Sequence, residues 1–218
     1  MLKFYRFLIL PLTAVFLAST AGIARYAADS CTQARMYRQL TALTENFPGD
    51  AASPGNDFLP QYQALYTQNS DLAGWIQIDG TNINYPVMWT PNNPNYYLKH
   101  SFEKEYSDYG VPYIDEDCVM GESNNYVIYG HHMKNETMFH DLCNYASKDF
   151  YDEHPTIKFD TLFGFGEYQI VAVFRFDTNN DTFRYNQFTD MDEEHFKNFM
   201  NSVHPVSYTH LTLPTNRE

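Results

Sequence analysis

Apolar and polar residues alternate from Trp75 onward, and this period of two limits the possible fold more than any other feature. Two such runs, at residues 75–80 and 83–88, flank a turn that contains Gly80, which is the pattern of a β-hairpin. Four further runs predict strands at residues 111–114, 125–131, 156–160 and 167–177. Many short strands among few helices favour a mainly β fold with helices, arranged as a closed or partly closed barrel.

Four segments have the apolar spacing of helices, at residues 29–47, 58–67, 137–154 and 191–203. Pro48-Gly49 ends the first of them, and Asp190 is expected to cap the last. Residues 28–70 are therefore predicted to form a helical extension that precedes a barrel domain at residues 71–205.

An uncharged apolar run lies at the N-terminus, at residues 7–23. A helix that spans a bilayer needs about 17 to 25 such residues, so this run is near the lower limit. Lys3 and Arg6 precede it and Arg25 follows it, which predicts a cytoplasmic N-terminus and an exported body. We expect residues 1–27 to form a single-pass anchor in the cell membrane, with a cleaved signal peptide as the alternative.

Charge and cysteine content exclude several classes of protein. The formal net charge is -13 and the pI is about 4.9, whereas binding to nucleic acid requires a basic face. The three cysteines are an odd number without a CxxC pair, which disfavours zinc ribbons and thioredoxin-like redox sites. A nucleic-acid partner is therefore not expected.

The strand predicted at residues 125–131 ends in Gly130-His131-His132. A strand that delivers an imidazole to the rim of a β fold can supply a general acid/base. Adjacent strand residues point to opposite faces, so only one of these two histidines can face a cleft. His140 lies nearby and raises a metal hypothesis, but this spacing is not a recognised ligand pattern, and no metal is expected.

The cysteines do not provide an obvious nucleophile to accompany this histidine. Cys118 follows Asp115-Glu116-Asp117, and negative neighbours raise a thiol pKa. Cys143 is expected on the inward face of a helix, where it would behave as a small hydrophobic residue. Cys31 adjoins the membrane segment. A pair of Cys118 with His131 is conceivable, because they end successive strands, but it is disfavoured.

The last residues continue no predicted element. Residues 206–215 look like translated read-through of a transposase sequencing adapter, and such segments are excluded from reasoning about the fold. We therefore expect residues 206–218 to be a non-native tail, with a genuine C-terminal tail as the alternative.

Five segments stand out in order along the chain: Asp71-Leu72-Ala73-Gly74-Trp75-Ile76-Gln77-Ile78-Asp79-Gly80-Thr81, Ile83-Asn84-Tyr85-Pro86-Val87, Tyr96-Tyr97-Leu98-Lys99-His100-Ser101-Phe102, Val127-Ile128-Tyr129-Gly130-His131-His132-Met133 and Thr137-Met138-Phe139. Taken together, they resemble the class B sortases, membrane-anchored cysteine transpeptidases of Gram-positive bacteria. This resemblance covers about residues 71–203. It implies a sortase-like β-barrel of about eight strands, incomplete here at the C-terminus, with an N-terminal helical extension.

The resemblance also implies roles for particular residues. His131 takes the place of the catalytic histidine, and Leu98 is expected near the groove for the sorting signal. The nucleophile of this family is the cysteine of a Thr-Leu-x-Thr-Cys motif on a late strand, with an arginine on the next strand. Residues 211–215 mimic that motif, but Asn216 stands where the cysteine belongs, and Arg217 is not taken as the arginine. The nucleophilic cysteine is thus predicted to be absent and this chain inactive.

The implied activity is the cleavage of a C-terminal sorting signal and its transfer, through a thioester, to a cell-wall amine. The implied partners are secreted proteins that carry sorting signals, together with a peptidoglycan or pilin amine as acceptor, and no cofactor is implied. Two alternatives from other classes stay open: an exported β-barrel binding module without catalysis, and a metal hydrolase.

Overall fold

The computed structural model describes residues 2–45, 58–175 and 189–203. The chain divides into two compact units, Met1–Gln39 and Leu40–Glu218. Residues 51–56, between the first two predicted helices, and the predicted foreign tail at 206–218 lie outside the described residues.

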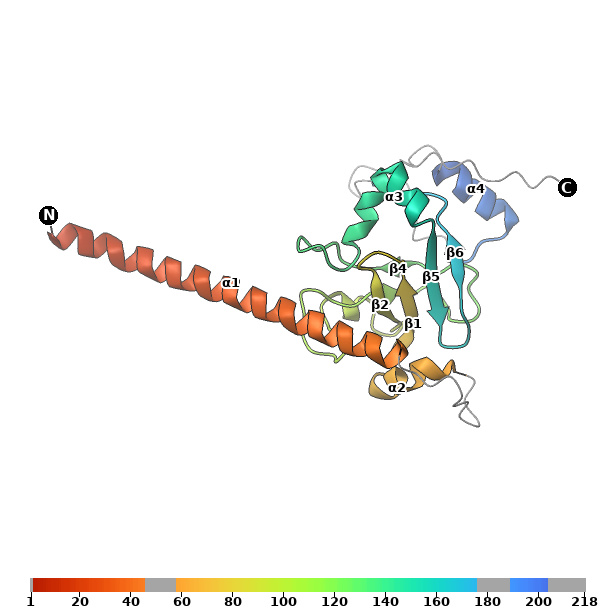
Figure 1. Ribbon diagram of the computed structural model, residues 1–218, viewed down its shortest axis with the longest axis horizontal. Helices are drawn as coiled ribbons and strands as arrows, with labels where there is room; N and C mark the ends of the chain where they lie inside the picture. Colours follow the sequence, from red (N-terminus) through yellow and green to blue (C-terminus); the bar gives the residue numbers. More distant parts are fainter. Residues whose placement is uncertain (1, 46–57, 176–188, 204–218) are drawn as a thin grey trace. The chain divides into compact units, whose positions relative to one another are not determined.

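The first helix, α1, runs from Leu2 to Glu45 without interruption (Figure 1). The sequence predicted a helix that begins only near Asp29. The difference has a local cause: residues 24–28 are Ala-Arg-Tyr-Ala-Ala, which contain no helix breaker. Within the part of the chain that the structure describes, no helix combines the length and apolar character needed to cross a bilayer.

One six-stranded sheet forms the centre of the second unit, in the order β4-β3-β2-β1-β5-β6. Its strands are β1 (Leu72–Gln77), β2 (Asn84–Met88), β3 (Tyr113–Ile114), β4 (Ile128–Tyr129), β5 (Thr156–Thr161) and β6 (Glu167–Gln169). Only β2 and β3 run parallel to each other, and the other neighbours are antiparallel. The sheet is therefore mixed, and Figure 1 shows β1, β2, β5 and β6 side by side.

The β1–β2 hairpin is the buried centre of this sheet, and it confirms the first sequence prediction. Trp75 pairs with Pro86 and Ile76 with Tyr85, and nearly all residues of both strands are buried. Gly80 in the connecting turn has φ +77°, a left-handed conformation that glycine adopts at little cost. Burial on both faces of these strands agrees with the apolar residues at adjacent positions, Trp75 and Ile76 in β1 and Val87 and Met88 in β2, where the alternation of the sequence is interrupted.

The outer strands are shorter than predicted. The prediction placed a strand at 125–131, yet β4 covers only Ile128 and Tyr129. The strand predicted at 167–177 ends at Gln169 in β6, and its last two residues lie outside the described part of the chain. All three residues of β6 are exposed. The apolar and aromatic residues that follow Gln169 led the sequence pattern to predict a longer strand than the structure has.

A second difference from the predicted helices lies after β4. Residues 137–154 were expected to form one helix, but they form a 3-10 helix, η2 (His140–Ala146), and a short α-helix, α3 (Lys148–Glu153). The two meet at Ser147, whose ψ of 129° is extended. Ser147 thus ends one helix and begins the next, as serine does at helix N-termini.

The last described helix, α4 (Glu193–Val203), is close to the prediction, but its cap is different. Asp192, not Asp190, accepts a hydrogen bond from the backbone N–H of His195 at 2.8 Å. That bond lowers the pKa of Asp192, because a carboxylate near a helix N-terminus is favoured in its charged form.

The short helix α2 (Pro60–Gln68) begins with proline at its first turn, as helices commonly do. It packs on the sheet through Tyr62, whose hydroxyl donates to Asp160 Oδ2 of β5 at 2.7 Å. Leu59 N also donates to Leu162 O at 2.6 Å. The large buried side chains of the core include Tyr97, Tyr109, Tyr145, Phe102, Leu65 and Ile78.

Candidate active site

His131 directly follows the β4 strand and Gly130, and the structure brings it to Leu98. Its Nε2 atom lies 2.7 Å from the Leu98 carbonyl oxygen. A carbonyl oxygen only accepts hydrogen bonds, so Nε2 must carry the proton in this contact. In the neutral imidazole, Nδ1 is then the nitrogen that can accept a proton. The two residues that the resemblance singled out therefore meet, although 33 positions separate them.

Gly130, directly before His131, determines how closely the Phe139 ring can approach the backbone. The ring of Phe139 lies against it, so that a Cβ atom at position 130 would stand 2.5 Å from two ring carbons. The N–H of Phe139 donates to the His131 carbonyl oxygen at 2.8 Å. The absence of a side chain at 130 thus allows the Phe139 ring to pack beside the backbone that carries His131.

The Leu98 carbonyl belongs to a 3-10 turn, η1 (Tyr96–Leu98). Val111 N donates to Tyr97 O at 3.0 Å, which joins this turn to the segment before β3. Gly110 has φ +59°, and a Cβ there would lie 2.5 Å from Tyr97 O and 2.8 Å from Leu98 O. Only glycine therefore allows the two backbone segments to approach this closely.

His132 and His140, the other histidines of the metal hypothesis, form a separate pair. The His132 and His140 rings stack with centroids 4.8 Å apart, and His140 Nδ1 lies 3.5 Å from Asp141 Oδ1. Across the described ranges, no three His, Cys, Asp or Glu side chains are grouped as a metal ion requires. These histidines therefore do not belong to a group of side chains that could hold a metal ion.

Cys118 is buried and lies against backbone, not in an open cleft. Its Sγ atom is 3.5 Å from Val127 N and 3.7 Å from Asn125 O. Burial raises the pKa of the Cys118 thiol, and Asp115 and Asp117 add to the rise. The predicted direction is confirmed, but desolvation outweighs the acidic neighbours, and the thiol is a poor nucleophile.

The prediction for Cys143 was wrong. The structure places this side chain on the surface, because residues 140–146 form a 3-10 helix whose faces differ from those of the expected α-helix. Cys31 is exposed as well.

An apolar cavity of about 490 Å³ lies over β1, β4, β5 and β6. Its lining includes Ile76, Ile128, Phe139, Leu142, Phe159 and Tyr168. Phe139 therefore contacts both the cavity and the backbone at Gly130. The sequence analysis assigned no role to Phe139 or Gly110, because close packing between distant segments produces no periodic pattern in the sequence. The glycines themselves and the aromatic residues near them were the features that could have indicated this packing.

Comparison with known proteins decides the family. The family model described as the sortase domain matches residues 76–215. The chain belongs to the sortase family. The match enters the segment predicted to be foreign, where residues 211–215 imitate the Thr-Leu-x-Thr motif, and the origin of that segment stays a prediction.

The relatives are class B sortases, which confirms the resemblance noted in the sequence. The chain is 33% identical to Sortase B of Staphylococcus aureus over 138 residues, which are 63% of this chain and 56% of the relative. The chain spans about half the length of the curated relatives that it matches.

Solved structures show the same fold. The Staphylococcus aureus sortase B–substrate complex superposes with a TM-score of 0.71 at 24% identity, over 87% of this chain and 83% of that one. A sortase B in complex with triglycine superposes with a TM-score of 0.69 at 24% identity, over 86% and 84%. The chain thus has the sortase fold, with a long N-terminal helix and a curled, mixed six-stranded sheet among the described residues.

Proposed function

We propose that this chain is part of a class B sortase and that His131 is its general acid/base. The observation that carries the proposal is the contact of His131 Nε2 with the Leu98 carbonyl at the end of β4. This contact orients the imidazole and assigns the proton to Nε2, so Nδ1 can exchange a proton with a nucleophile. Family membership supports the same role.

In the proposed reaction, a cysteine thiolate attacks a threonine carbonyl in the sorting signal, and a tetrahedral intermediate forms. Collapse of the intermediate breaks the peptide bond and leaves a thioester, while the imidazolium of His131 gives its proton to the leaving amine. An incoming amine then attacks the thioester, loses a proton to His131 and releases the thiolate. An arginine would stabilise the oxyanion.

None of the three cysteines suits the role of nucleophile. Cys118 is buried with a raised pKa, and Cys31 and Cys143 are surface residues of helices that do not carry the imidazole. We therefore propose that this chain does not catalyse transfer, and that the cysteine and the arginine belong to later strands that would complete the barrel.

We propose that the donors are secreted proteins with a sorting signal and that the acceptor is a peptidoglycan or pilin amine. The complexes of related sortase B proteins with a substrate and with triglycine support these classes. For location, we propose a single-pass anchor at residues 1–27 with the catalytic unit outside the cell. The basic residues Lys3 and Arg6 before the apolar run support this orientation.

A binding module without catalysis is the second candidate. The apolar cavity favours it, because about 490 Å³ lined by residues such as Tyr126, Phe159 and Tyr168 could hold an apolar ligand.

The test reads and expresses the gene from its genomic source beyond the codon for Val203. We expect a downstream Thr-Leu-x-Thr-Cys segment and cleavage of a sorting-signal peptide by the longer protein. His131→Ala should abolish that cleavage, whereas Cys118→Ala should leave it unchanged. A natural stop codon near Val203, or cleavage by the present chain that Cys118→Ala abolishes, would contradict the proposal.

A further inference from the structure

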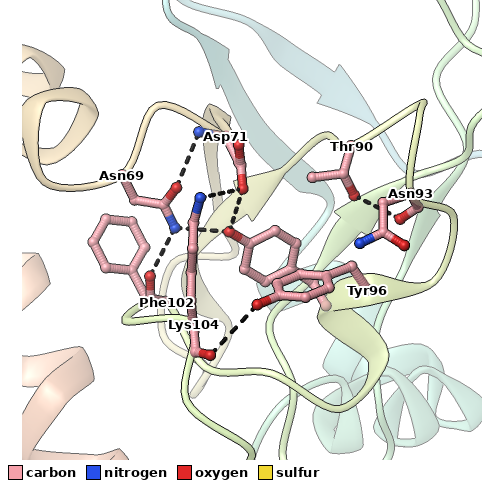
Figure 2. A network of polar contacts seen from close by, with 8 residues as sticks. Asn69, Asp71, Thr90, Asn93, Tyr96, Phe102 and Lys104 are labelled. Carbon is pink, nitrogen blue, oxygen red and sulfur yellow. Dashed lines mark hydrogen bonds and ion pairs between the residues drawn. The ribbon is translucent and has the colours of Figure 1, made fainter.

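A partly buried polar network surrounds the Tyr97 hydroxyl, next in the chain to the Leu98 carbonyl. Tyr97 is fully buried. Its hydroxyl donates to Asp71 Oδ2 at 2.8 Å and accepts from Asn69 Nδ2 at 2.7 Å. Figure 2 shows the side chains of Asn69 and Lys104 converging with Asp71, and Lys104 Nζ reaches Asp71 Oδ2 at 2.8 Å. The Tyr97 hydroxyl is therefore held between two fixed groups at the start of β1.

Every member of this network is itself anchored. Asn69 Nδ2 also donates to Phe102 O at 2.7 Å, and its Oδ1 accepts from Asp71 N at 3.0 Å. Lys104 has φ +66°, a left-handed conformation that is unusual for lysine. Tyr97 and Asn69 are buried with their hydrogen bonds made, so displacing either side chain would leave a buried polar group without its partner.

The backbone of Tyr97 is held from the other side as well. Its carbonyl accepts from Val111 N at 3.0 Å, and Gly110 lets the two backbone segments approach closely because it has no Cβ atom. Leu98 follows directly in the chain, and its N–H donates to Asn95 O at 3.1 Å. The Leu98 carbonyl thus projects from a peptide segment that is restrained at the Tyr97 side chain and at its backbone.

We infer that Tyr97, through Asn69 and Asp71, is a positioning residue for His131. The network fixes the Leu98 carbonyl, and the carbonyl fixes the Nε2–H tautomer and the orientation of the imidazole. The inference rests on the proposed role of His131, but it makes a claim about geometry that can be tested without catalysis. Tyr97 touches neither substrate nor reacting atoms.

The test measures the ring nitrogen shifts of His131 in the full chain labelled with ¹⁵N-histidine, at alkaline pH where imidazoles are neutral. The His131→Gln variant assigns the signals. In the unmodified chain we expect the two nitrogens to be widely separated in shift, as in a single Nε2–H tautomer. In Tyr97→Phe, which keeps the ring and removes the hydroxyl, the two shifts should move toward each other as the second tautomer becomes populated.

Three variants separate positioning from a general loss of stability. Tyr145→Phe removes an equally buried hydroxyl that donates to His154 O at 2.8 Å, and it should leave the His131 shifts unchanged. Asp71→Asn keeps an acceptor for Tyr97 and should also preserve them, whereas Asp71→Ala should not. If Tyr97→Phe does not fold, the comparison of Asp71→Ala with Asp71→Asn takes its place.

Equal effects of Tyr97→Phe and Tyr145→Phe on the His131 shifts, or no effect of Tyr97→Phe and Asp71→Ala, would overturn the inference. In the longer protein, Tyr97→Phe should lower kcat and leave KM unchanged, since a displacement of about 1 Å at a reacting group can cost up to about 100-fold. An absent downstream cysteine would refute the proposed function alone, because the tautomer measurement does not require it.

Discussion

The contact between Gly130 and Phe139 offers a direct test of how the site is built. In Gly130→Ala the new Cβ would stand 2.5 Å from two Phe139 ring carbons. Carbon atoms in contact stay about 3.5–4.0 Å apart, so the ring must retreat by about 1 Å. Overpacking of this kind costs about 1–3 kcal/mol. The apolar cavity beside Phe139 gives the ring some room, and we therefore expect the lower part of that range, about 1–2 kcal/mol.

A double-mutant cycle isolates this steric term. Phe139→Ala removes the ring, so adding Gly130→Ala in that background should change the free energy of unfolding by no more than about 0.5 kcal/mol. Gly164→Ala is the matched control, because no atom lies within 4 Å of its added Cβ and its φ is ordinary. The control should be nearly neutral in both backgrounds.

Urea unfolding followed by tryptophan fluorescence measures all of these variants, since Trp75 is buried in β1. The expected coupling between positions 130 and 139 is about 1–2 kcal/mol, the difference between the two costs of Gly130→Ala. An equal cost of Gly130→Ala with and without the Phe139 ring would refute the reasoning, because the penalty would then come from the backbone and not from the ring.

Two further predictions concern groups away from the imidazole. A thiol reagent should label Cys31 and Cys143 quickly in the native chain but Cys118 only after unfolding, because Cys118 is buried with a raised pKa; fast labelling of Cys118 would contradict its placement. The second prediction concerns buried tyrosines. Burial raises the pKa of Tyr145 to about 12. Burial also raises the pKa of Tyr97; Asp71 raises it further, and the hydrogen bond from Asn69 lowers it. Unfolded tyrosine titrates near 10, so the unfolded chain loses these protons first, and the free energy of unfolding should fall above about pH 10 by up to about 1.4 kcal/mol per pH unit for each tyrosine. Urea titrations from pH 9 to 12 measure the slope, and Tyr145→Phe should flatten it; an unchanged slope would refute the assignment.

Local pattern was sufficient for the centre of the fold. The hairpin of β1 and β2 was predicted, although β1 lies three residues earlier than expected, and the helices α2 and α4 were predicted to within two residues of their observed bounds, because burial leaves apolar residues at a regular spacing. The prediction of one helix at residues 137–154 was wrong. The apolar residues recur there as in a single α-helix, but they belong to a 3-10 helix and a short α-helix. Cys143 was misplaced for the same reason.

By itself the sequence determined which residue types were available: Gly130 and His131 directly after a strand, and aromatic residues for the core. Only the tertiary structure decided that the His131 imidazole meets the Leu98 carbonyl, and that Gly110 and the Tyr97 hydroxyl hold that carbonyl in place. The physical reason is the separation in sequence between the residues that interact. Periodicity reports on neighbours along one strand or helix, whereas a hydrogen bond across 33 positions depends on how separate segments pack.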